Sequence, residues 1–144
     1  LSAYGVTFHR HNSEIDQMIR KYTKKKFKFT FTPHLSPMFR GILSTIYIDL
    51  KTGYSIKKVQ YLLKNFYKKN SFVKISKNDT LISTNEVINT NNCIISVYKT
   101  NYKNKIIILS AIDNLIKGGA GQAIQNINIV KDFKINEGLK WKDI

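Results

Sequence analysis

The stretch "CIISVYKTNYKNKIIILSAI", residues 93–112, contains two apolar runs separated by a short polar segment. Isoleucine and valine dominate both runs, and β-branched residues pack well on the pleated surface of a sheet. Residues 101–104 are polar and contain two asparagines, which favour tight turns. We therefore predict two antiparallel strands joined by a hairpin, and the rest of the fold is built outward from this pair.

Three further segments have strand patterns. Residues 42–50 ("ILSTIYIDL") are rich in β-branched side chains, and residues 72–76 ("FVKIS") form a short apolar run. In residues 27–32 ("FKFTFT"), phenylalanine alternates with lysine or threonine, and this period of two indicates a half-buried strand. The polar and turn-rich residues 78–92 are predicted to be mainly loop.

Three segments have helical patterns. Ser13 is suited to cap a helix that ends near Lys26 and has acidic residues at its start and lysines at its end. Residues 55–69 ("SIKKVQYLLKNFYKK") have one apolar and one lysine-rich face. A last helix is predicted over residues 114–130. It has apolar residues at core spacing: Ile116, Ala120, Ala123, Ile124 and Ile127.

The predicted elements follow the order α, β, β, α, three β, α. This order indicates the α+β class, with a mixed or antiparallel sheet and helices on one face. The 144 residues are enough for one domain with its own core, so residues 1–144 are assigned to a single domain. The first residue is Leu1 and not methionine, and we expect the chain to be part of a longer polypeptide.

The chain is strongly basic, with 24 lysine and arginine residues, 9 acidic residues and a net charge of +15. Only three of the basic residues are arginines, and the lysines are scattered among asparagine and isoleucine, which argues against a specific nucleic-acid site. A lysine-rich nucleic-acid-binding module stays open as an alternative of a different class. A basic surface would also attract anionic substrates.

Three features of the sequence bear on where in the cell the protein is found and on what it binds. No apolar run reaches the roughly 20 residues that a membrane-spanning helix needs. The single cysteine, Cys93, cannot form an internal disulfide and is compatible with a reducing compartment, so we expect a cytoplasmic protein. Neither glycine-rich nucleotide-binding fingerprint occurs, and no metal site is predicted.

Two stretches near the N-terminus combine residues that packing alone does not require. In His9-Arg10-His11, two imidazoles suited to acid–base work flank a rare arginine, although two ordinary surface histidines would give the same pattern. Residues 33–41 form a loop with two prolines that presents Arg40. This arginine can bind a carboxylate or phosphate, or it can form an internal ion pair, and both readings stay open.

A third such stretch is "DNLIKGGAGQAIQN", residues 113–126. Gly118, Gly119 and Gly121 each disfavour a helix by about 1 kcal/mol relative to alanine, which indicates close approach of a ligand or of another backbone. A helix N-terminus at this point would favour an anion. Tight packing between helices is the alternative explanation.

Taken together, three stretches resemble one enzyme family. "AYGVTFHRHNSEIDQ" (3–17), "FTPHLSPMFRGILSTIY" (31–47) and "SAIDNLIKGGAGQAIQNINI" (110–129) are similar, in the same order, to its H-R-H-x-P-E-I, F-x-P-H-L-x-P-M-x-R-G and D-N-L-x-K-G-A-A-G-Q-A-x-Q-N motifs. "NEVINTNNC" (85–93) is similar to its V-x-G-T-N-x-C pattern. The family is N-acetyl-gamma-glutamyl-phosphate reductase, the NADPH-dependent enzyme of arginine biosynthesis, and the resemblance is to its C-terminal part.

The resemblance implies a reaction and a fold. The family converts N-acetyl-glutamyl 5-phosphate to N-acetyl-glutamate 5-semialdehyde and phosphate through a cysteine thioester, with NADP as cofactor. Its fold is like the second domain of glyceraldehyde-3-phosphate dehydrogenase, and its last long helix packs on an N-terminal Rossmann domain. Partners implied are that domain, absent here, and further copies in a dimer or tetramer, with no nucleic acid and no membrane.

The resemblance also implies roles for residues. His11 would be the catalytic acid–base residue, and His9 would orient the segment. Substrate binding would involve Arg10, His34 and Arg40. Cofactor binding would involve Asn114, Gly118, Gly119 and Gln122.

This sequence departs from the family pattern in several respects. Ser13 stands where the family usually has proline, and Gly119 replaces an alanine. The nucleophile-bearing S-G-C-Y-P-T-like motif does not occur in this chain, and Cys93 lies in an apolar strand pattern where we expect it to be buried. The chain alone is therefore expected to be inactive. A sister acyl-phosphate reductase, aspartate-semialdehyde dehydrogenase or the carrier-bound reductase of lysine biosynthesis, is the alternative.

Overall fold

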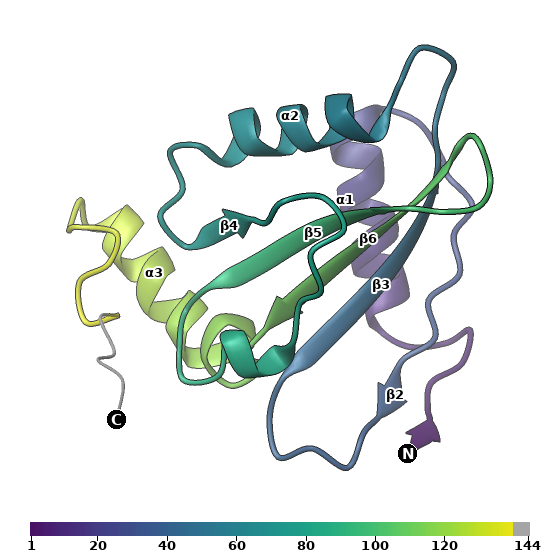
Figure 1. Ribbon diagram of the computed structural model, residues 1–144. Coiled ribbons are helices and arrows are strands. Elements are labelled where there is room, and N and C mark those ends of the chain that lie inside the picture. Colours follow the sequence, from purple (N-terminus) through teal and green to yellow (C-terminus); the bar gives the residue numbers. More distant parts are fainter. Residues whose placement is uncertain (140–144) are drawn as a thin grey trace. The chain divides into compact units, whose positions relative to one another are not determined.

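The computed structural model describes residues 1–139 and divides into two compact units (Figure 1). The first unit is Leu1–Phe39, and the second begins at Arg40. The second unit contains the larger, four-stranded sheet.

The sheet of the second unit has four strands in the order β3-β6-β5-β4. Their bounds are Ile42–Asp49 for β3, Val73–Ile75 for β4, Cys93–Lys99 for β5 and Lys105–Ile112 for β6. β6 pairs antiparallel with both β3 and β5, whereas β4 pairs parallel with β5, so the sheet is mixed. The predicted hairpin is confirmed, with Cys93 opposite Ile112 and Lys99 opposite Ile106.

The two faces of the sheet are covered by different segments. Helix α2 (Ile56–Tyr67) contacts β4 and β5, and Ser55 caps it by accepting a hydrogen bond from the Lys58 N–H (Figure 1). On the opposite face, Ile94 and Ala111 pack against Ile82 and Val87 from the loop region 78–92. This region is mainly loop, as predicted, with a short 3-10 helix, η1, at Thr84–Glu86.

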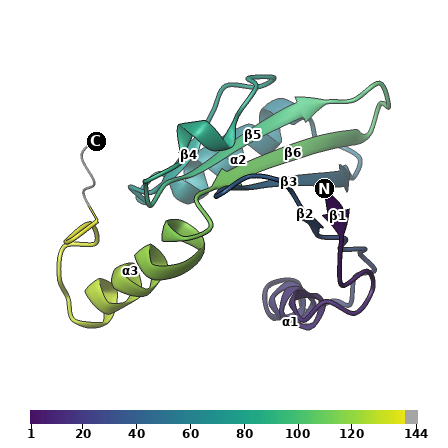
Figure 2. The same cartoon turned by 90° about the horizontal axis from the view of Figure 1, so that it is seen from below.

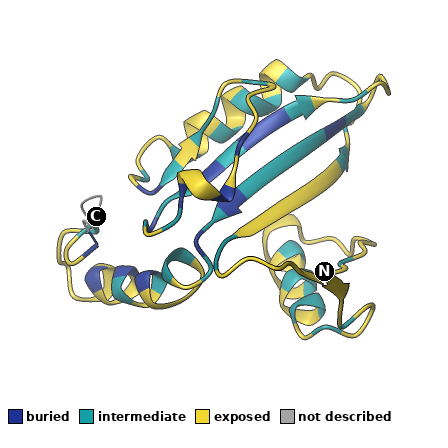
Figure 3. Ribbon diagram, turned by 60° about the horizontal axis from the view of Figure 1, so that its bottom comes forward, coloured by how far each residue is buried: buried dark blue, intermediate teal, exposed yellow. Residues whose placement is uncertain are grey.

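Strand β3 lies at one edge of the sheet and is exposed along almost its whole length (Figure 3). Side chains alternate across a strand, so Ile42 and Ile46 share one face while Leu43 and Tyr47 share the other. All four are exposed. An apolar edge strand that is open on both faces is a surface suited to contact with another protein chain.

The predicted last helix begins differently from the expectation. A π-helical turn, η2 (Ile116–Ala120), follows β6 and leads into α3 (Gly121–Val130) (Figure 2). Gly119 interrupts the helical backbone with φ −148° and ψ −114°. A break of this kind changes which residues face inward beyond it.

The inward face of this helix in residues 1–139 matches the predicted core positions only in part. The buried residues of α3 are Gly121, Gln125 and Asn128. Ile116 and Ile124 are half-buried, whereas Ala120, Ala123 and Ile127 are exposed. Asn128 faces inward because its Nδ2 donates to the carbonyls of Ile135 and Glu137, which follow the helix.

The first unit contains helix α1 (His11–Thr23) and two short strands, β1 (Ser2–Ala3) and β2 (His34–Leu35), which pair antiparallel. The strand predicted at 27–32 is wrong, since these residues pair with no strand. Ser13 is not the N-cap, because the helix already begins at His11 and the Ser13 hydroxyl donates to the Arg10 carbonyl at 2.8 Å. The turn over Gly5–His9 precedes Arg10 and gives the helix an earlier start.

The α+β class and the mixed sheet are as predicted. Within residues 1–139, no helix is both long and apolar enough to cross a membrane.

Candidate functional site

The histidine pair of the first unit lies in a small aromatic cluster. The His9 ring contacts Tyr4, Phe31 and His11 edge to face, with a centroid separation of 4.6 Å from the His11 ring. The His11 backbone N–H donates to Nδ1 of His9 at 3.2 Å. Because that nitrogen accepts, the proton of a neutral His9 is on Nε2. The His9 ring is thus held by the hydrogen bond to its Nδ1 and by its contacts with three neighbouring rings.

His11 is held in place by this cluster but stays accessible. Its side chain is 46% exposed, and its Nε2 lies 3.9 Å from the Glu14 carboxylate, beyond hydrogen-bonding distance. It begins α1, so its backbone is fixed by helical geometry while its ring nitrogens can reach solvent or a substrate. This arrangement suits a group that gives or takes a proton.

The two other predicted binding residues of this unit are also exposed. Arg10 precedes the first residue of α1. His34 lies in β2, opposite Ala3, and its Nδ1 is 3.2 Å from the Thr32 carbonyl. A carbonyl only accepts, so the Nδ1–H of His34 donates and its Nε2 is left as acceptor.

In the second unit, Arg40 joins an internal ion pair, one of the two roles left open from its sequence context. Its Nη1 is 3.2 Å from Oδ2 of Asp113 and also donates to Oδ1 of Asn89. The Arg40 side chain is 23% exposed, and that of Asp113 is completely buried. The pair lies where β3 begins and β6 ends.

Both carboxylate oxygens of Asp113 accept two hydrogen bonds each. Oδ1 accepts from the backbone N–H groups of Leu115 and Ile116, and Oδ2 accepts from the Asn89 N–H and from Arg40. Burial by itself would raise the pKa of the Asp113 carboxyl. The three backbone hydrogen bonds and the charge of Arg40 outweigh burial, so the pKa of Asp113 is lower than usual.

The neighbouring residue, Asn114, fixes the start of β3. Its Oδ1 accepts from the Gly41 N–H at 2.6 Å. Gly41 has φ +113°, and a Cβ there would lie 2.8 Å from Cβ of Thr84, so only glycine fits. Asp113 and Asn114 together therefore hold Arg40 and Gly41.

The three glycines at positions 118, 119 and 121 differ in their surroundings. One is closely packed, and the other two are exposed at the surface. A Cβ on Gly121 would lie 2.5 Å from Oδ1 of Asn91, so this glycine allows a close approach within the chain. Gly118 and Gly119 are exposed, and a Cβ on either would meet only ordinary contacts. The N–H groups of Gly118, Ala120 and Gly121 donate to carbonyls within the turn, so they do not form the expected anion site.

A polar network connects α3 to η2 and to the loop that precedes β5. Oε1 of Gln125 accepts from Nδ2 of Asn91 at 2.9 Å and from Nζ of Lys117 at 2.8 Å. Burial lowers the pKa of the Lys117 ammonium, against a smaller opposing effect of Cys93. Cys93 is half-buried, not buried as expected, and its Sγ lies 3.4 Å from the Ser110 hydroxyl.

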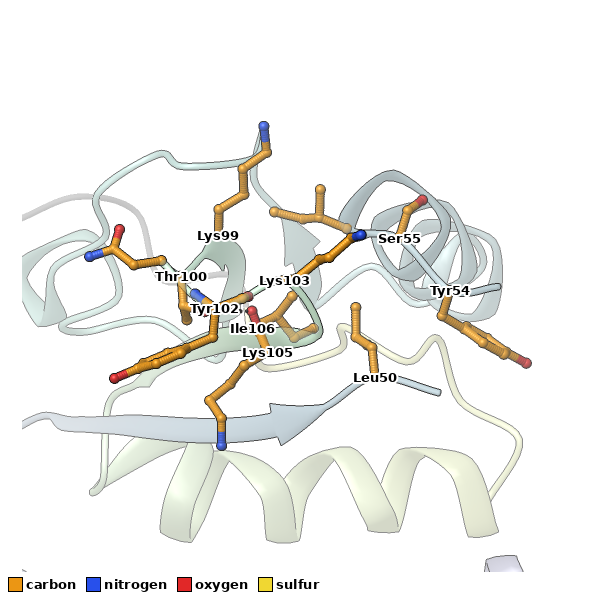
Figure 4. Close-up of a pocket in the computed structure, with 11 residues that line it drawn as sticks. Leu50, Tyr54, Ser55, Lys99, Thr100, Tyr102, Lys103, Lys105 and Ile106 are labelled. Atoms are coloured by element: carbon orange, nitrogen blue, oxygen red, sulfur yellow. Dashed lines mark hydrogen bonds between the residues drawn. The ribbon is translucent and has the colours of Figure 1, made fainter. Parts of the chain in front are cut away.

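A cavity of about 360 Å³ lies at the other end of the sheet, beside the turn between β5 and β6. Lys99, Lys103 and Lys105 line it, but Figure 4 shows their ammonium groups pointing in different directions. Lys105 is also paired with Asp49 at 2.8 Å. Within residues 1–139, no group of three or more His, Cys, Asp or Glu side chains is arranged to hold a metal ion.

The family described as "semialdehyde dehydrogenase, dimerisation domain" matches residues 1–114, which is most of the chain. The chain belongs to this semialdehyde dehydrogenase family. The match includes the histidine cluster, the Arg40 loop and the Asp113–Asn114 dipeptide.

Relatives in this semialdehyde dehydrogenase family are named N-acetyl-gamma-glutamyl-phosphate reductase. One from Staphylococcus aureus (strain MRSA252) is 43% identical over 144 residues, which is all of this chain and 42% of the relative. One from Clostridium botulinum (strain Alaska E43 / Type E3) is 45% identical over 136 residues, 94% of this chain and 40% of the relative. The resemblance found in the sequence is thus confirmed, and the chain spans about two fifths of these relatives.

Sequence reasoning missed Asp113, the residue to which Arg40 and Asn89 are both hydrogen-bonded in the second unit. Asp113 stands in the apolar context "SAIDNLI", and a lone acid at the end of an apolar strand was the available signal. Its partners Arg40 and Asn89 are distant in sequence, so only the folded sheet of this semialdehyde dehydrogenase family member brings them together.

Proposed function

We propose that this chain is the substrate-binding and dimerisation part of an N-acetyl-gamma-glutamyl-phosphate reductase. Such an enzyme converts N-acetyl-glutamyl 5-phosphate to N-acetyl-glutamate 5-semialdehyde and phosphate. The observation that carries the proposal is the 43% identity to a relative of that name over all 144 residues. The histidine cluster supports it, because a held but accessible imidazole suits proton transfer.

In this proposal His11 is the acid–base residue. Its exposed ring would take the proton of the attacking thiol and later return a proton as the aldehyde forms. The thiol belongs to a cysteine outside this chain, since Cys93 is half-buried in β5 and paired with Ser110. Arg10, His34 and Arg40 are proposed to bind the carboxylate or phosphate of the substrate.

NADP is the proposed cofactor, and its reduced form, NADPH, would supply the hydride when bound. Exposed Gly118 and Gly119 suit close van der Waals approach of a flat group. They do not suit a phosphate, because the neighbouring N–H groups already donate within the turn. Asn114 and Gln122 would add side-chain amides beside that surface. The residues therefore fit the nicotinamide end better than the phosphate end.

We also propose that the chain forms a dimer through β3. The matching family is described as a dimerisation domain, and β3 is the exposed apolar edge of the sheet. The proposed contact is the part of β3 that carries the exposed side chains of Leu43 and Tyr47.

The test of function is an assay of the complete reductase that contains this chain. Purified protein is given NADPH and the acyl phosphate, and the loss of NADPH absorbance is followed with and without substrate. Steady phosphate release and cofactor oxidation are expected, with NADH as the comparison. Preference for aspartyl phosphate would instead support a sister enzyme.

Residues 1–144 alone are expected to be inactive in the same assay, because this chain offers no suitable nucleophile. Turnover by this chain that Cys93→Ser abolishes would contradict that expectation. It would also give Cys93 a catalytic role.

A further inference from the structure

The Asp113 carboxylate is held in one orientation by its donors. Each of its two oxygens accepts two hydrogen bonds, from Leu115 and Ile116 on Oδ1 and from Asn89 and Arg40 on Oδ2. An ionised carboxylate offers about four lone-pair positions, so this arrangement leaves it no freedom to rotate. The donors come from three separate segments of the second unit.

The Arg40 guanidinium is fixed in turn. Its Nη1 carries two hydrogens and donates to Oδ2 of Asp113 and to Oδ1 of Asn89. Two acceptors on one terminal nitrogen set the plane of the whole group. The next residue is also fixed, since Gly41 donates to Asn114. The arginine can therefore be neither swung away nor rotated without breaking this set.

Stability alone is a weak reason for such an arrangement. A buried ion pair contributes little compared with apolar packing of the same size, because both charges lose their hydration. The other ion pair of the same two strands, Asp49–Lys105, is exposed and joins the opposite end at 2.8 Å. Of the two ends of this strand pair, one therefore carries an exposed ion pair and the other carries the buried Asp113 carboxylate.

We propose that Asp113 is a positioning residue, which together with Asn89 holds the Arg40 guanidinium in the orientation that binds the anionic end of the substrate. This inference rests on the proposed function. It deepens that function by assigning a role to two residues that touch no substrate themselves. Fixing a binding group before the substrate arrives lowers the entropy cost of binding.

The experiment compares three variants of the complete reductase. Asp113→Asn keeps the size of the side chain but removes its charge and one acceptor. Asn89→Gly removes only the contact to Arg40, because its backbone has φ +59°, which glycine adopts readily, and its N–H to Asp113 remains. Asp49→Asn is the matched control, with the same substitution at the other end of the strand pair.

The expected result is a split between kinetic constants. Asp113→Asn should raise the KM for the acyl phosphate by about 10- to 100-fold, with a smaller change in the KM for NADPH and in kcat. Asn89→Gly should change the same constant in the same direction by a smaller factor. Asp49→Asn should leave all three constants within about twofold of the parent.

An unchanged substrate KM in folded Asp113→Asn would overturn the inference, and so would equal losses toward both substrates. If Asp113→Asn does not fold, Asn89→Gly decides, and an unchanged KM in that variant overturns the inference. A parent enzyme without activity would overturn the proposed function instead. Calorimetric titration with N-acetylglutamate then tests the positioning role, which fails if parent and Asn89→Gly bind it equally or not at all.

Discussion

His9 and His11 differ in what their rings can do, although they stand only two positions apart. Nδ1 of His9 is occupied by the His11 N–H, and its ring is enclosed by aromatic neighbours. The His11 side chain is 46% exposed. A proton carrier needs an accessible nitrogen, whereas a support needs fixed contacts.

We therefore expect His11→Ala to lower the turnover of the complete reductase by about 100-fold or more, the usual range for loss of an acid–base group. His9→Ala should cost less, and His9→Asn less still, because the asparagine oxygen can accept the His11 N–H near the position of Nδ1. Steady-state kinetics of the three purified variants measure this. A larger loss for His9→Ala than for His11→Ala would reverse the assignment.

The low pKa of Asp113 predicts how the fold responds to acid. Its carboxyl has a lower pKa in the folded chain than the value of about 3.9 in an unfolded one, so the folded form binds this proton less readily. Its stabilising contribution is therefore complete above about pH 5 and is lost as the pH falls below about 4.

Urea unfolding between pH 7 and pH 3 measures this contribution. At neutral pH, Asp113→Asn should unfold with a free energy lower by about 2–4 kcal/mol, because it leaves Arg40 without its charge partner. That difference should begin to shrink as the pH falls below about 4, because the Asp113 carboxyl of the unfolded parent then takes up a proton more readily than that of the folded parent. A difference that stays constant with pH would show that the charge of Asp113 contributes nothing.

At the level of the elements, the hairpin, helix α2 and the end of the later helix at Val130 were predictable, whereas the start of that helix was not. The high content of isoleucine and valine determines β5 and β6 locally, and Ser55 with the apolar stripe that follows it determines α2. The break at Gly119 depends on which backbone dihedrals the turn adopts, and no local spacing reveals it. Beyond that break Ile124 is half-buried, but the buried positions Gly121, Gln125 and Asn128 were not predicted.

The strand predicted at 27–32 fails for another reason. Alternation shows which side chains share a face, and Phe31 does pack on the histidine rings. It cannot show whether a neighbouring strand is present to complete the ladder. The contact between Asp113 and Arg40 could not be predicted for a related reason, because the two residues are 73 positions apart in the sequence. The family motifs singled out candidate residues such as Arg40 and Asn114, but not the contacts that they make with Asp113 and Gly41.

Two glycines of the η2–α3 segment should respond differently to alanine. At Gly121, a Cβ would lie 2.5 Å from Oδ1 of Asn91 and 2.6 Å from Cγ2 of Ile116, so Gly121→Ala should destabilise the fold by about 1–3 kcal/mol. Gly118→Ala is the matched control, because its nearest contact is an ordinary 3.5 Å. Thermal unfolding measures both. Equal melting temperatures would contradict the packing role of Gly121.

The cofactor-facing role proposed for Gly118 has a separate test. Gly118→Val in the complete reductase should raise the KM for NADPH, since a branched side chain would block close approach at an exposed site. A well-folded variant with unchanged cofactor kinetics would limit this glycine to a part in the turn.

For the whole molecule, the exposed face of β3 predicts the oligomeric state. Tyr47 is 68% exposed in β3, and Tyr61 is 67% exposed on α2. If β3 is the dimer contact, Tyr47→Lys should convert the complete protein to monomer, because a charge would be buried against the partner. Tyr61→Lys, the same change at the same exposure, should not. Sedimentation or light scattering distinguishes these outcomes, and a dimer that survives Tyr47→Lys would place the contact elsewhere.

The ion pairs at the two ends of β3 and β6 differ in exposure, so the two ends of this strand pair should not separate equally easily. Dissolved ions screen the exposed Asp49–Lys105 pair, where the Asp49 side chain is 81% exposed, but they scarcely reach the buried Asp113. Added salt should therefore loosen the ladder from the hairpin end only. In hydrogen-exchange measurements, the amides beside Asp49 and Lys105 should lose protection as salt rises, while those beside Ile42 and Ile112 keep theirs. The strand pair would open from the end that carries Asp49 and Lys105 and would stay paired at the end next to Arg40. Fluctuations of the sheet would therefore begin at the end farthest from Arg40.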